Sequence, residues 1–182
     1  MEKFTLDKNQ TTLMVIDIQD RLVPAMNMAK KVVHNTHILL SAAKEFNIPI
    51  ITTEQYPKGL GNTVPELQND IDHSYLFEKV CFNAYTDEVK VALEQLNRKK
   101  IIITGMETHI CIFQTVRDLL INEYEVFVVS DAICSRTKEN YKNGLDLMQQ
   151  MGAIITNTET VLFDLLKKAG TPSFKTLSKL IK

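Results

Sequence analysis

The 182-residue sequence contains few cysteines, and this bears on where the protein works. There are only three, Cys81, Cys111 and Cys134, and none of them forms a CxxC pair. Three scattered cysteines are too few for the disulfide framework that holds a small secreted domain together. The sequence therefore predicts a cytoplasmic protein in which at least one thiol is free.

A strong charge of one sign and a long hydrophobic run are also missing. The chain has 21 Lys and Arg residues against 22 Asp and Glu residues, which gives a net charge of −1. This balance offers no electrostatic reason to expect nucleic acid or an anionic membrane as a partner. No transmembrane run or signal peptide is visible, since residues 1–10 are polar and charged. We expect a small-molecule substrate, no nucleic acid and no membrane.

Internal repeats, low-complexity segments and linkers are absent as well. The apolar fraction is 45% and the charged fraction 24%, both ordinary for a globular protein. A chain of this length can bury one sizeable core. We therefore expect residues 1–182 to form a single domain.

Apolar, β-branched runs alternate with segments of helical period along the chain. The expected strands are residues 11–18, 48–53, 75–80, 101–104, 125–129 and 153–155. The expected helices are residues 24–47, 86–97, 138–151, 158–168 and 173–182, and a further helix that begins within a few residues of Gly105 and includes Leu120. Residues 54–67 are rich in Pro and Gly and predict a loop. Alternation of this kind predicts an α/β fold of three layers, a six-stranded parallel sheet with helices on both faces.

The stretch from residue 100 to residue 120 carries the first candidate for chemistry. A buried strand turns at Gly105, and Cys111 follows near the start of an amphipathic helix. The partial positive charge of a helix N-terminus lowers a thiol pKa and favours the thiolate. Cys111 is therefore a candidate nucleophile, although cysteine is also among the most commonly buried residues and can be purely structural.

Two further candidates lie at the ends of other strands. Asp17 ends the first strand and Lys79 lies near the end of the third. In a parallel sheet these ends share one edge, so an acid, a base and a thiol should meet there. A carboxylate that accepts the proton of Cys111, with an ammonium group beside it, suits acyl transfer through a thioester. The backbone N–H groups between Gly105 and Cys111 could receive the oxyanion. A structural Asp–Lys ion pair beside a buried cysteine is the alternative.

Other side chains are candidates for the walls of the site, each with a structural alternative. Gln19 follows Asp17 by two residues and would point to the same side of a strand. Glu54 could meet a cationic substrate group or cap the loop, and Arg136 is a candidate anion contact. The remaining candidates for substrate contact are Tyr56, Phe82, His109 and Phe113.

Several motifs occur together in an order that resembles a known family. These are VIDIQ around Asp17, TEQYPKGLGNTVPEL after the second strand, FEKVCFNAY around Lys79, TGMETHICIFQT around Cys111, and VVSDAICSR. Over nearly its whole length the chain resembles the isochorismatase-like cysteine hydrolases, in particular the small isochorismatase-domain-containing branch. The order of strands expected from this resemblance is of the Rossmann type.

The resemblance implies specific roles. Cys111 would be the nucleophile, Asp17 the general base and then acid, and Lys79 the group that balances charge. A cis peptide bond is implied between Met106 and Glu107, which would direct the N–H groups of Glu107 and Cys111 at the oxyanion. The expected activity is hydrolysis of a small amide or related C–N bond, without cofactor.

The sequence departs from the family in two places. Where the nicotinamidase branch has an Asp/His metal cluster, residues 53–56 read TEQY, without histidine, so we expect no metal site and not nicotinamide as substrate. Enzymes that cleave isochorismate itself generally lack the cysteine that is present here. A catalytically silent oligomeric scaffold is the rival function, and a homo-oligomer is expected in either case, as is usual in the family.

Overall fold

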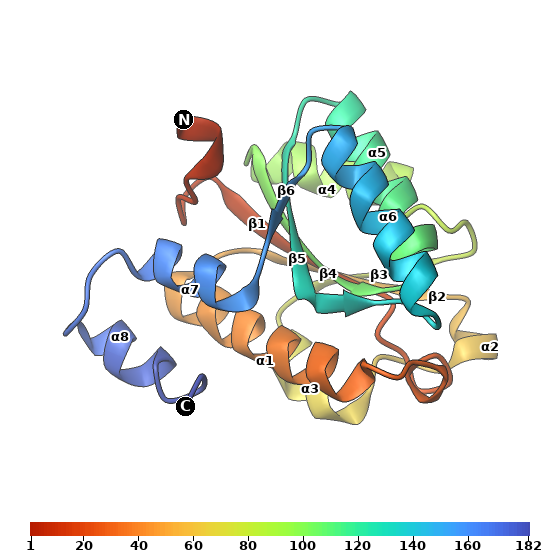
Figure 1. The fold of residues 1–182 in the computed structure, drawn as a ribbon, viewed down its shortest axis with the longest axis horizontal. Coiled ribbons are helices and arrows are strands. Elements are labelled where there is room, and N and C mark those ends of the chain that lie inside the picture. The colour runs from red at the N-terminus through yellow and green to blue at the C-terminus, as the bar shows by residue number, and fades with distance from the viewer.

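A computed structural model describes residues 1–182 as three layers, with a parallel sheet between two sets of helices (Figure 1). The sheet has six strands in the order β3-β2-β1-β4-β5-β6, and every pairing is parallel. The expected fold class and strand order are confirmed. The strands are β1 (Thr11–Ile16), β2 (Ile50–Gln55), β3 (Tyr75–Lys79), β4 (Lys100–Met106), β5 (Glu125–Cys134) and β6 (Ile154–Thr156).

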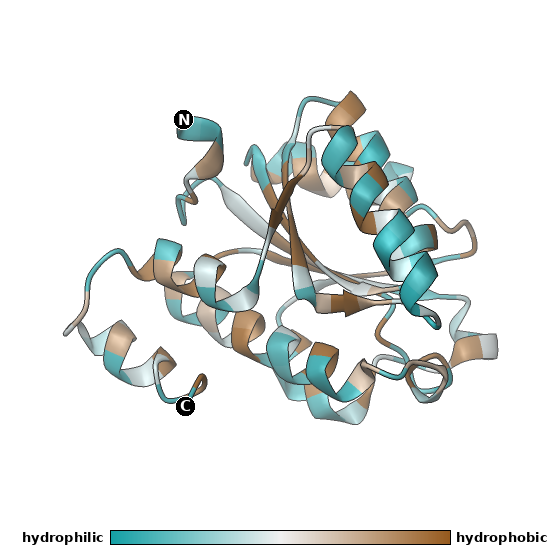
Figure 2. Ribbon diagram, viewed as in Figure 1, coloured by the Kyte–Doolittle hydropathy of each residue, from teal (hydrophilic) through white to brown (hydrophobic).

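Helices cover both faces of the sheet. Helices α1 (Ala29–Phe46), α3 (Pro65–Ile71), α7 (Thr158–Leu166) and α8 (Pro172–Leu177) lie on one side, and α4 (Asp87–Leu96), α5 (Phe113–Ile121) and α6 (Lys138–Gln150) on the other. Every residue of β1 and β4 is buried, so their apolar runs serve both layers. Figure 2 shows the hydrophobic residues concentrated on the strands and a hydrophilic outer face on α6.

Several expected boundaries were wrong. The first long helix begins at Ala29 rather than at Pro24, which lies in a short 3-10 turn, η2 (Val23–Ala25). The closing helix spans only Pro172–Leu177, and the side chain of Asn157, rather than Thr158, caps α7.

Residues 54–67, expected as one loop, instead complete β2 and form two short helices. These are α2 (Pro57–Leu60) and the start of α3. Proline occupies the first helical position in both cases, where its missing N–H costs no hydrogen bond. The proline residues that suggested a loop therefore begin helices.

The chain reverses its direction of winding between β1 and β4, which are neighbours at the centre of the sheet. Open α/β sheets bind their ligands beyond the carboxyl ends of the strands at such a point. Gly105 permits the close pairing there, because a Cβ on this residue would lie 2.0 Å from the carbonyl oxygen of Ile16, and its φ is +134°. No helix in residues 1–182 is long and apolar enough to cross a membrane.

Candidate active site

Asp17 and Lys79 form a buried ion pair at the carboxyl edge of the sheet. Lys79 Nζ lies 2.6 Å from Asp17 Oδ2, and the two side chains are 1% and 0% exposed. Asp17 directly follows β1 with a φ of 54°, so the chain turns there instead of continuing as a strand. Thr53 Oγ1 donates a hydrogen bond of 2.8 Å to the other carboxylate oxygen. The two side chains expected to meet therefore do so.

The ammonium group of Lys79 is held from several sides. Besides Asp17 it donates to Gln55 Oε1 at 2.7 Å and to the backbone carbonyls of Cys81 at 3.3 Å and Phe82 at 3.1 Å. A buried cation with this many acceptors has little freedom to move. Its charge is therefore fixed beside the Asp17 carboxylate.

Cys111 completes the group from a third segment. It lies in a π-helix, η3 (Thr108–Ile112), between β4 and α5, and is 7% exposed. The Asp17 carboxylate, the Lys79 ammonium group and the backbone N–H of Glu107 all lie close enough to affect the pKa of its thiol. The structure therefore brings together all three side chains that the sequence proposed as catalytic.

The protonation state of Cys111 differs from expectation. Burial, followed by the charge of Asp17, raises the pKa of the Cys111 thiol to about 12, although Lys79 and the Glu107 N–H lower it. The expected lowering of this pKa near a helix start was wrong, because burial and a neighbouring carboxylate outweigh the lowering effects of Lys79 and the Glu107 N–H. Before substrate binds, Cys111 is a thiol at neutral pH.

Burial also raises the pKa of the Asp17 carboxyl group, against the lowering effects of Lys79, Thr53 and Cys111. A carboxylate with a raised pKa is a stronger base than an ordinary aspartate. The pair of Cys111 and Asp17 is thus arranged for proton transfer from sulfur to oxygen. After that transfer the negative charge is on the Cys111 sulfur, and the positive charge of Lys79 balances it.

The turn before Cys111 has the backbone form that the family resemblance implied. The peptide bond between Met106 and Glu107 is cis, as expected. The Glu107 carboxylate accepts hydrogen bonds from the backbone N of Arg136 at 3.0 Å and from its Nε at 3.1 Å. Arg136, expected as a contact for a substrate anion, therefore already has an anion as its partner.

The side chains of Gln19 and Glu54 form hydrogen bonds to neighbouring segments of the protein around the site. Gln19 Nε2 donates to the carbonyls of Gln55 and Gly61, and its Oε1 accepts from Gln55 N. The reason given for its direction was wrong, because β1 ends at Ile16 and strand alternation does not reach Gln19. Glu54 Oε1 accepts from the backbone N and the hydroxyl of Thr63, which matches its alternative role as a loop cap.

The four remaining candidates for substrate contact take different positions. Tyr56 and Phe82 are 53% and 55% exposed, and Tyr56 lines a surface hollow together with Lys79. His109 Nδ1 lies 2.9 Å from Ser135 Oγ. The Phe113 ring packs beneath the guanidinium of Arg117 at 5.6 Å. His109 and Phe113 therefore have partners within the protein itself.

Sequence reasoning missed Thr53 and Gln55 as parts of the site. Both belong to β2, where residues two apart share a face, and both contact the ion pair. Polar residues at the carboxyl end of a central strand are the signal that could have identified them. No group of three or more His, Cys, Asp or Glu side chains that could hold a metal ion is present in residues 1–182.

Comparisons with known proteins agree with the fold and the motifs. Residues 11–160 match the family model for the isochorismatase domain. A secreted isochorismatase effector, Isc1, of Phytophthora sojae is 37% identical over 96% of this chain and 85% of its own length.

Solved structures agree as well. A structure named MAR1 ribonuclease from Caenorhabditis elegans has a TM-score of 0.92 and 32% identity, covering 97% of this chain and 92% of that one. The YcaC gene product of Escherichia coli, described as an octameric hydrolase of unknown specificity, has a TM-score of 0.91 and 27% identity over 97% and 90% of the two chains.

Proposed function

The chain belongs to the isochorismatase family, and from this premise we propose that it is a cysteine hydrolase that cleaves a small-molecule amide or related C–N bond. One observation carries the proposal. Asp17, Lys79 and Cys111 come from three separate segments and meet in one buried group. Such a combination of acid, base and thiol suits nucleophilic acyl transfer.

In the first step the Cys111 sulfur attacks the carbonyl carbon of the substrate while its proton passes to Asp17. The raised pKa of the Asp17 carboxyl makes it able to accept that proton. The attack gives a tetrahedral intermediate whose oxygen is negative. Backbone N–H groups of the turn, those of Glu107 and Cys111, are proposed to receive this oxygen.

In the second step the C–N bond breaks. Asp17 gives the proton to the leaving nitrogen, so that a neutral amine or ammonia departs and an acyl thioester remains on Cys111. Asp17 is then ionised again and takes a proton from a water molecule that attacks the thioester. The carboxylic or carbamic acid leaves, and the proton returns to the Cys111 sulfur.

Lys79 acts by charge and position. Its ammonium group lies against the Asp17 carboxylate and is held by three further acceptors. When the thiol proton moves to Asp17, negative charge moves to the sulfur, and the nearby cation stabilises it. Lys79 thus assists each proton transfer without itself releasing a proton.

The test is a panel of amides, ureas and carbamoyl compounds, with release of ammonia or amine as the readout. Cys111→Ala should abolish turnover, and Cys81→Ala, at an exposed cysteine, should leave it unchanged. A covalent acyl group on Cys111, found by mass spectrometry after rapid quenching, would support the thioester. Full activity in Cys111→Ala and Asp17→Asn on a confirmed substrate would overturn the mechanism.

A catalytically silent scaffold on the same fold is the alternative. The complete set of Asp17, Lys79 and Cys111 favours the enzyme, because a site that has lost its activity is no longer under pressure to keep all three. A panel without any turnover, together with stable binding of a partner protein that persists in Cys111→Ala, would favour the scaffold.

Cleavage of RNA is a second candidate, favoured by the name of the Caenorhabditis elegans structure. The net charge of −1 gives the whole protein no electrostatic attraction for the phosphate backbone. Labelled RNA incubated with the protein and with Cys111→Ala decides the matter. Cleavage that is lost in the variant would place RNA hydrolysis at this site, whereas equal cleavage by both proteins would indicate a contaminating nuclease.

A cytoplasmic location also stays a proposal. Cys81, Cys111 and Cys134 are all unpaired, which suits a reducing compartment. The relative in Phytophthora sojae is named a secreted effector, so secretion is the alternative. Fractionation of the source cells and their medium, with a cytoplasmic marker as control, would distinguish the two.

A further inference from the structure

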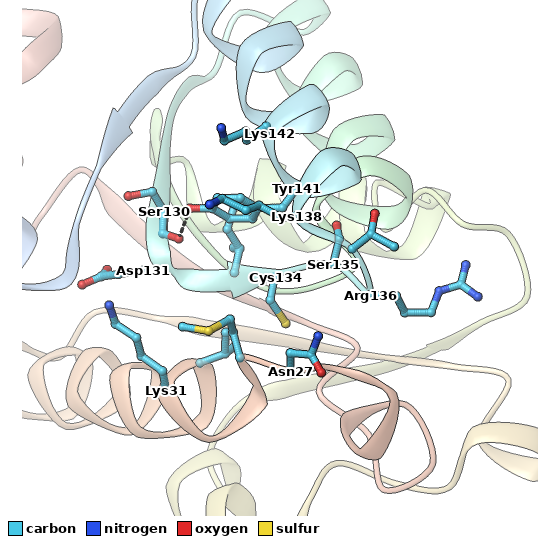
Figure 3. A pocket seen from close by; sticks show the side chains of 14 residues that line it. Asn27, Lys31, Ser130, Asp131, Cys134, Ser135, Arg136, Lys138, Tyr141 and Lys142 are labelled. Atoms are coloured by element: carbon cyan, nitrogen blue, oxygen red, sulfur yellow. Dashed lines mark hydrogen bonds between the residues drawn. The ribbon is translucent and has the colours of Figure 1, made fainter.

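A cavity of about 610 Å³ lies at the carboxyl end of β5, between the first turns of α1 and α6 (Figure 3). Its volume falls within the range of sites that hold small organic molecules, roughly 300–1,000 Å³. None of Asp17, Lys79 and Cys111 lines it. The cavity is therefore a place for a ligand apart from the proposed nucleophile.

Three lysines lie in the wall of this cavity. Lys31 comes from α1, and Lys138 and Lys142 come from α6. None of these three amines takes part in an ion pair. Three cations around one cavity without carboxylate partners favour an anionic ligand.

The two other charged groups in the wall already have partners. Arg136 Nε donates to Glu107 Oε2, so this guanidinium is directed away from the lysines, as Figure 3 shows. Asp131 Oδ1 accepts hydrogen bonds of 2.8 Å from the backbone N and the hydroxyl of Thr158 at the start of α7. The only carboxylate in the cavity wall is thus held by Thr158, and it forms no ion pair with any of the three lysines.

The inner wall is apolar and fixed. Val32, Ile133 and Cys134 are each at most 2% exposed, and burial together with Glu107 raises the pKa of the Cys134 thiol to about 12, so that it stays neutral. Tyr141 presents its ring, and its hydroxyl donates to the carbonyl of Ser130 at 2.7 Å. An uncharged molecular body can therefore lie against this wall.

We propose that this cavity binds a small organic anion, whose carboxylate or phosphate group is attracted by the lysines Lys31, Lys138 and Lys142 and whose apolar body lies against Val32, Ile133 and Tyr141. Three ammonium groups attract either kind of anion as point charges. The binding site does not depend on hydrolysis at Cys111, and it stands if the proposed function fails.

The cavity shares a wall with the turn that carries Cys111. Ser135 Oγ lies 2.9 Å from His109 Nδ1, and Arg136 contacts Glu107. A test must therefore separate the cavity from the thiol site. Cys111→Ala serves this purpose, because it removes the sulfur and leaves the residues of the cavity unchanged.

The experiment is titration calorimetry of the full chain with benzoate, phenyl phosphate and benzyl alcohol, which share a ring and differ in charge. We expect at least one of the two anions to bind at least tenfold more tightly than the alcohol, and more weakly as salt is raised. Preference for benzoate or for phenyl phosphate identifies the anionic group. Cys111→Ala should bind with unchanged affinity.

Substitutions of lysines test whether the anion binds in this cavity. Lys31→Met with Lys142→Met should weaken anion binding at least tenfold, while Lys90→Met, at an exposed lysine on α4, should not. If the double variant does not fold, each single substitution should weaken binding about threefold. Equal affinity for the alcohol and the anions, unchanged binding in the lysine variants, or binding that disappears in Cys111→Ala would each overturn the proposal.

Discussion

Asp17 occupies an unusual place for a charged residue, at 0% exposure directly after a fully buried strand. Lys79 compensates the charge of Asp17. The two groups act on Cys111 in opposite directions, because the Asp17 carboxylate raises the pKa of the thiol and the Lys79 ammonium lowers it. In the free protein Cys111 is therefore a thiol, and it loses its proton to Asp17 only during its attack on a substrate. This differs from a cysteine that is kept permanently as a thiolate.

At the residue scale, Asp17→Asn should change reactivity and turnover in opposite directions. Loss of the carboxylate removes a charge that raises the pKa of Cys111, while Lys79 still lowers it. The thiolate fraction at pH 7.5 should increase, and alkylation by iodoacetamide should become at least about tenfold faster, since one pKa unit is a tenfold change. Turnover should fall by about 10²–10⁴-fold, because the general base is gone.

The control for this prediction lies within the same protein. Cys81 is exposed and should be alkylated at one rate in every variant. Lys79→Met, which removes the cation, should make Cys111 no more reactive than in the unsubstituted protein. Peptide mapping by mass spectrometry measures both cysteines at once, and a Cys111 rate that does not respond to Asp17→Asn would contradict this account.

Two adjacent threonines, Thr52 and Thr53, allow a matched test of the pH dependence of turnover. The Thr53 hydroxyl donates to Asp17 and lowers the pKa of that carboxyl group. Thr53→Val should raise the pKa of Asp17 further, and because the base must be ionised, the acid limb of the activity profile should move to higher pH. We expect a shift of roughly half a pH unit, typical of one lost hydrogen bond.

Thr52 is equally buried, but its hydroxyl has no hydrogen-bond partner. Thr52→Val should therefore leave the acid limb in place and raise the free energy of unfolding by about 1 kcal/mol, because an unsatisfied buried hydroxyl is removed. Turnover between pH 4 and pH 8 and urea unfolding measure the two effects. Equal shifts in both variants would show that Thr53 does not act through Asp17.

At the scale of elements, the π-helix that carries Cys111 rests on α6. A Cβ at Gly144 would lie 2.9 Å from the carbonyl oxygen of Thr108 and 3.0 Å from the Cα of His109. Real Cβ atoms are rarely this close to backbone atoms, which cannot rotate away. Gly144 therefore sets the distance between α6 and the turn before Cys111.

Gly144→Ala should displace that turn. We expect turnover to fall at least about tenfold, since small displacements of a reacting group are costly, and the free energy of unfolding to fall by about 1–3 kcal/mol. Asn143→Ala, at the exposed neighbouring position of the same helix, is the control and should leave turnover unchanged. Kinetics and urea unfolding of both variants measure this, and full activity in Gly144→Ala would contradict it.

At the scale of the whole molecule, apolar side chains remain on the surface beside the open edge strand β3. Leu76, Val80 and Phe82 are 52%, 77% and 55% exposed. Apolar surface of this kind is typical of an interface. Burial of these side chains between copies of the chain would fit the homo-oligomer expected from the sequence.

Sedimentation velocity at micromolar concentration should therefore give a species larger than the 20.8 kDa monomer. Val80→Glu should shift the population toward monomer, because a charge would be buried at the interface. Glu139→Lys, at an exposed position on α6, is the control. A monomer at every concentration would refute the expectation.

Stability at high pH is a property of the whole molecule as well. The pKa of Cys134 is raised from 9.0 to about 12, chiefly by burial. Such a group adds stability that is present below pH 9 and is lost as the pH rises toward 12, because the unfolded thiol ionises first. The free energy of unfolding should fall between pH 8 and pH 10.5.

Cys134→Ala should reduce that fall by at least about 1 kcal/mol, since each pKa unit corresponds to about 1.4 kcal/mol. Cys81→Ala, at an exposed cysteine, should leave it unchanged. Urea unfolding at the two pH values measures the difference. An identical fall in both variants would show that Cys134 ionises as easily in the folded protein as in the unfolded one.

The sequence by itself determined the sheet and its place for chemistry. Runs such as residues 11–16 and 101–103 favour strands covered on both faces, and their alternation with helices favours a parallel sheet, as the structure has it. Parallel strands bring their carboxyl ends to one edge, so Asp17, Lys79 and Cys111 could be grouped before any contact was known.

Only the tertiary structure decided what these groups do to one another. Burial is a property of the surrounding protein, so the raised pKa of Cys111 could not be read from a position near a helix start. Thr53, Gln55 and Gly144 act through contacts with residues far along the chain. The cavity at Lys31 and Lys142 joins helices that are about a hundred residues apart in sequence. Local sequence patterns cannot predict contacts between residues that are so far apart in the chain.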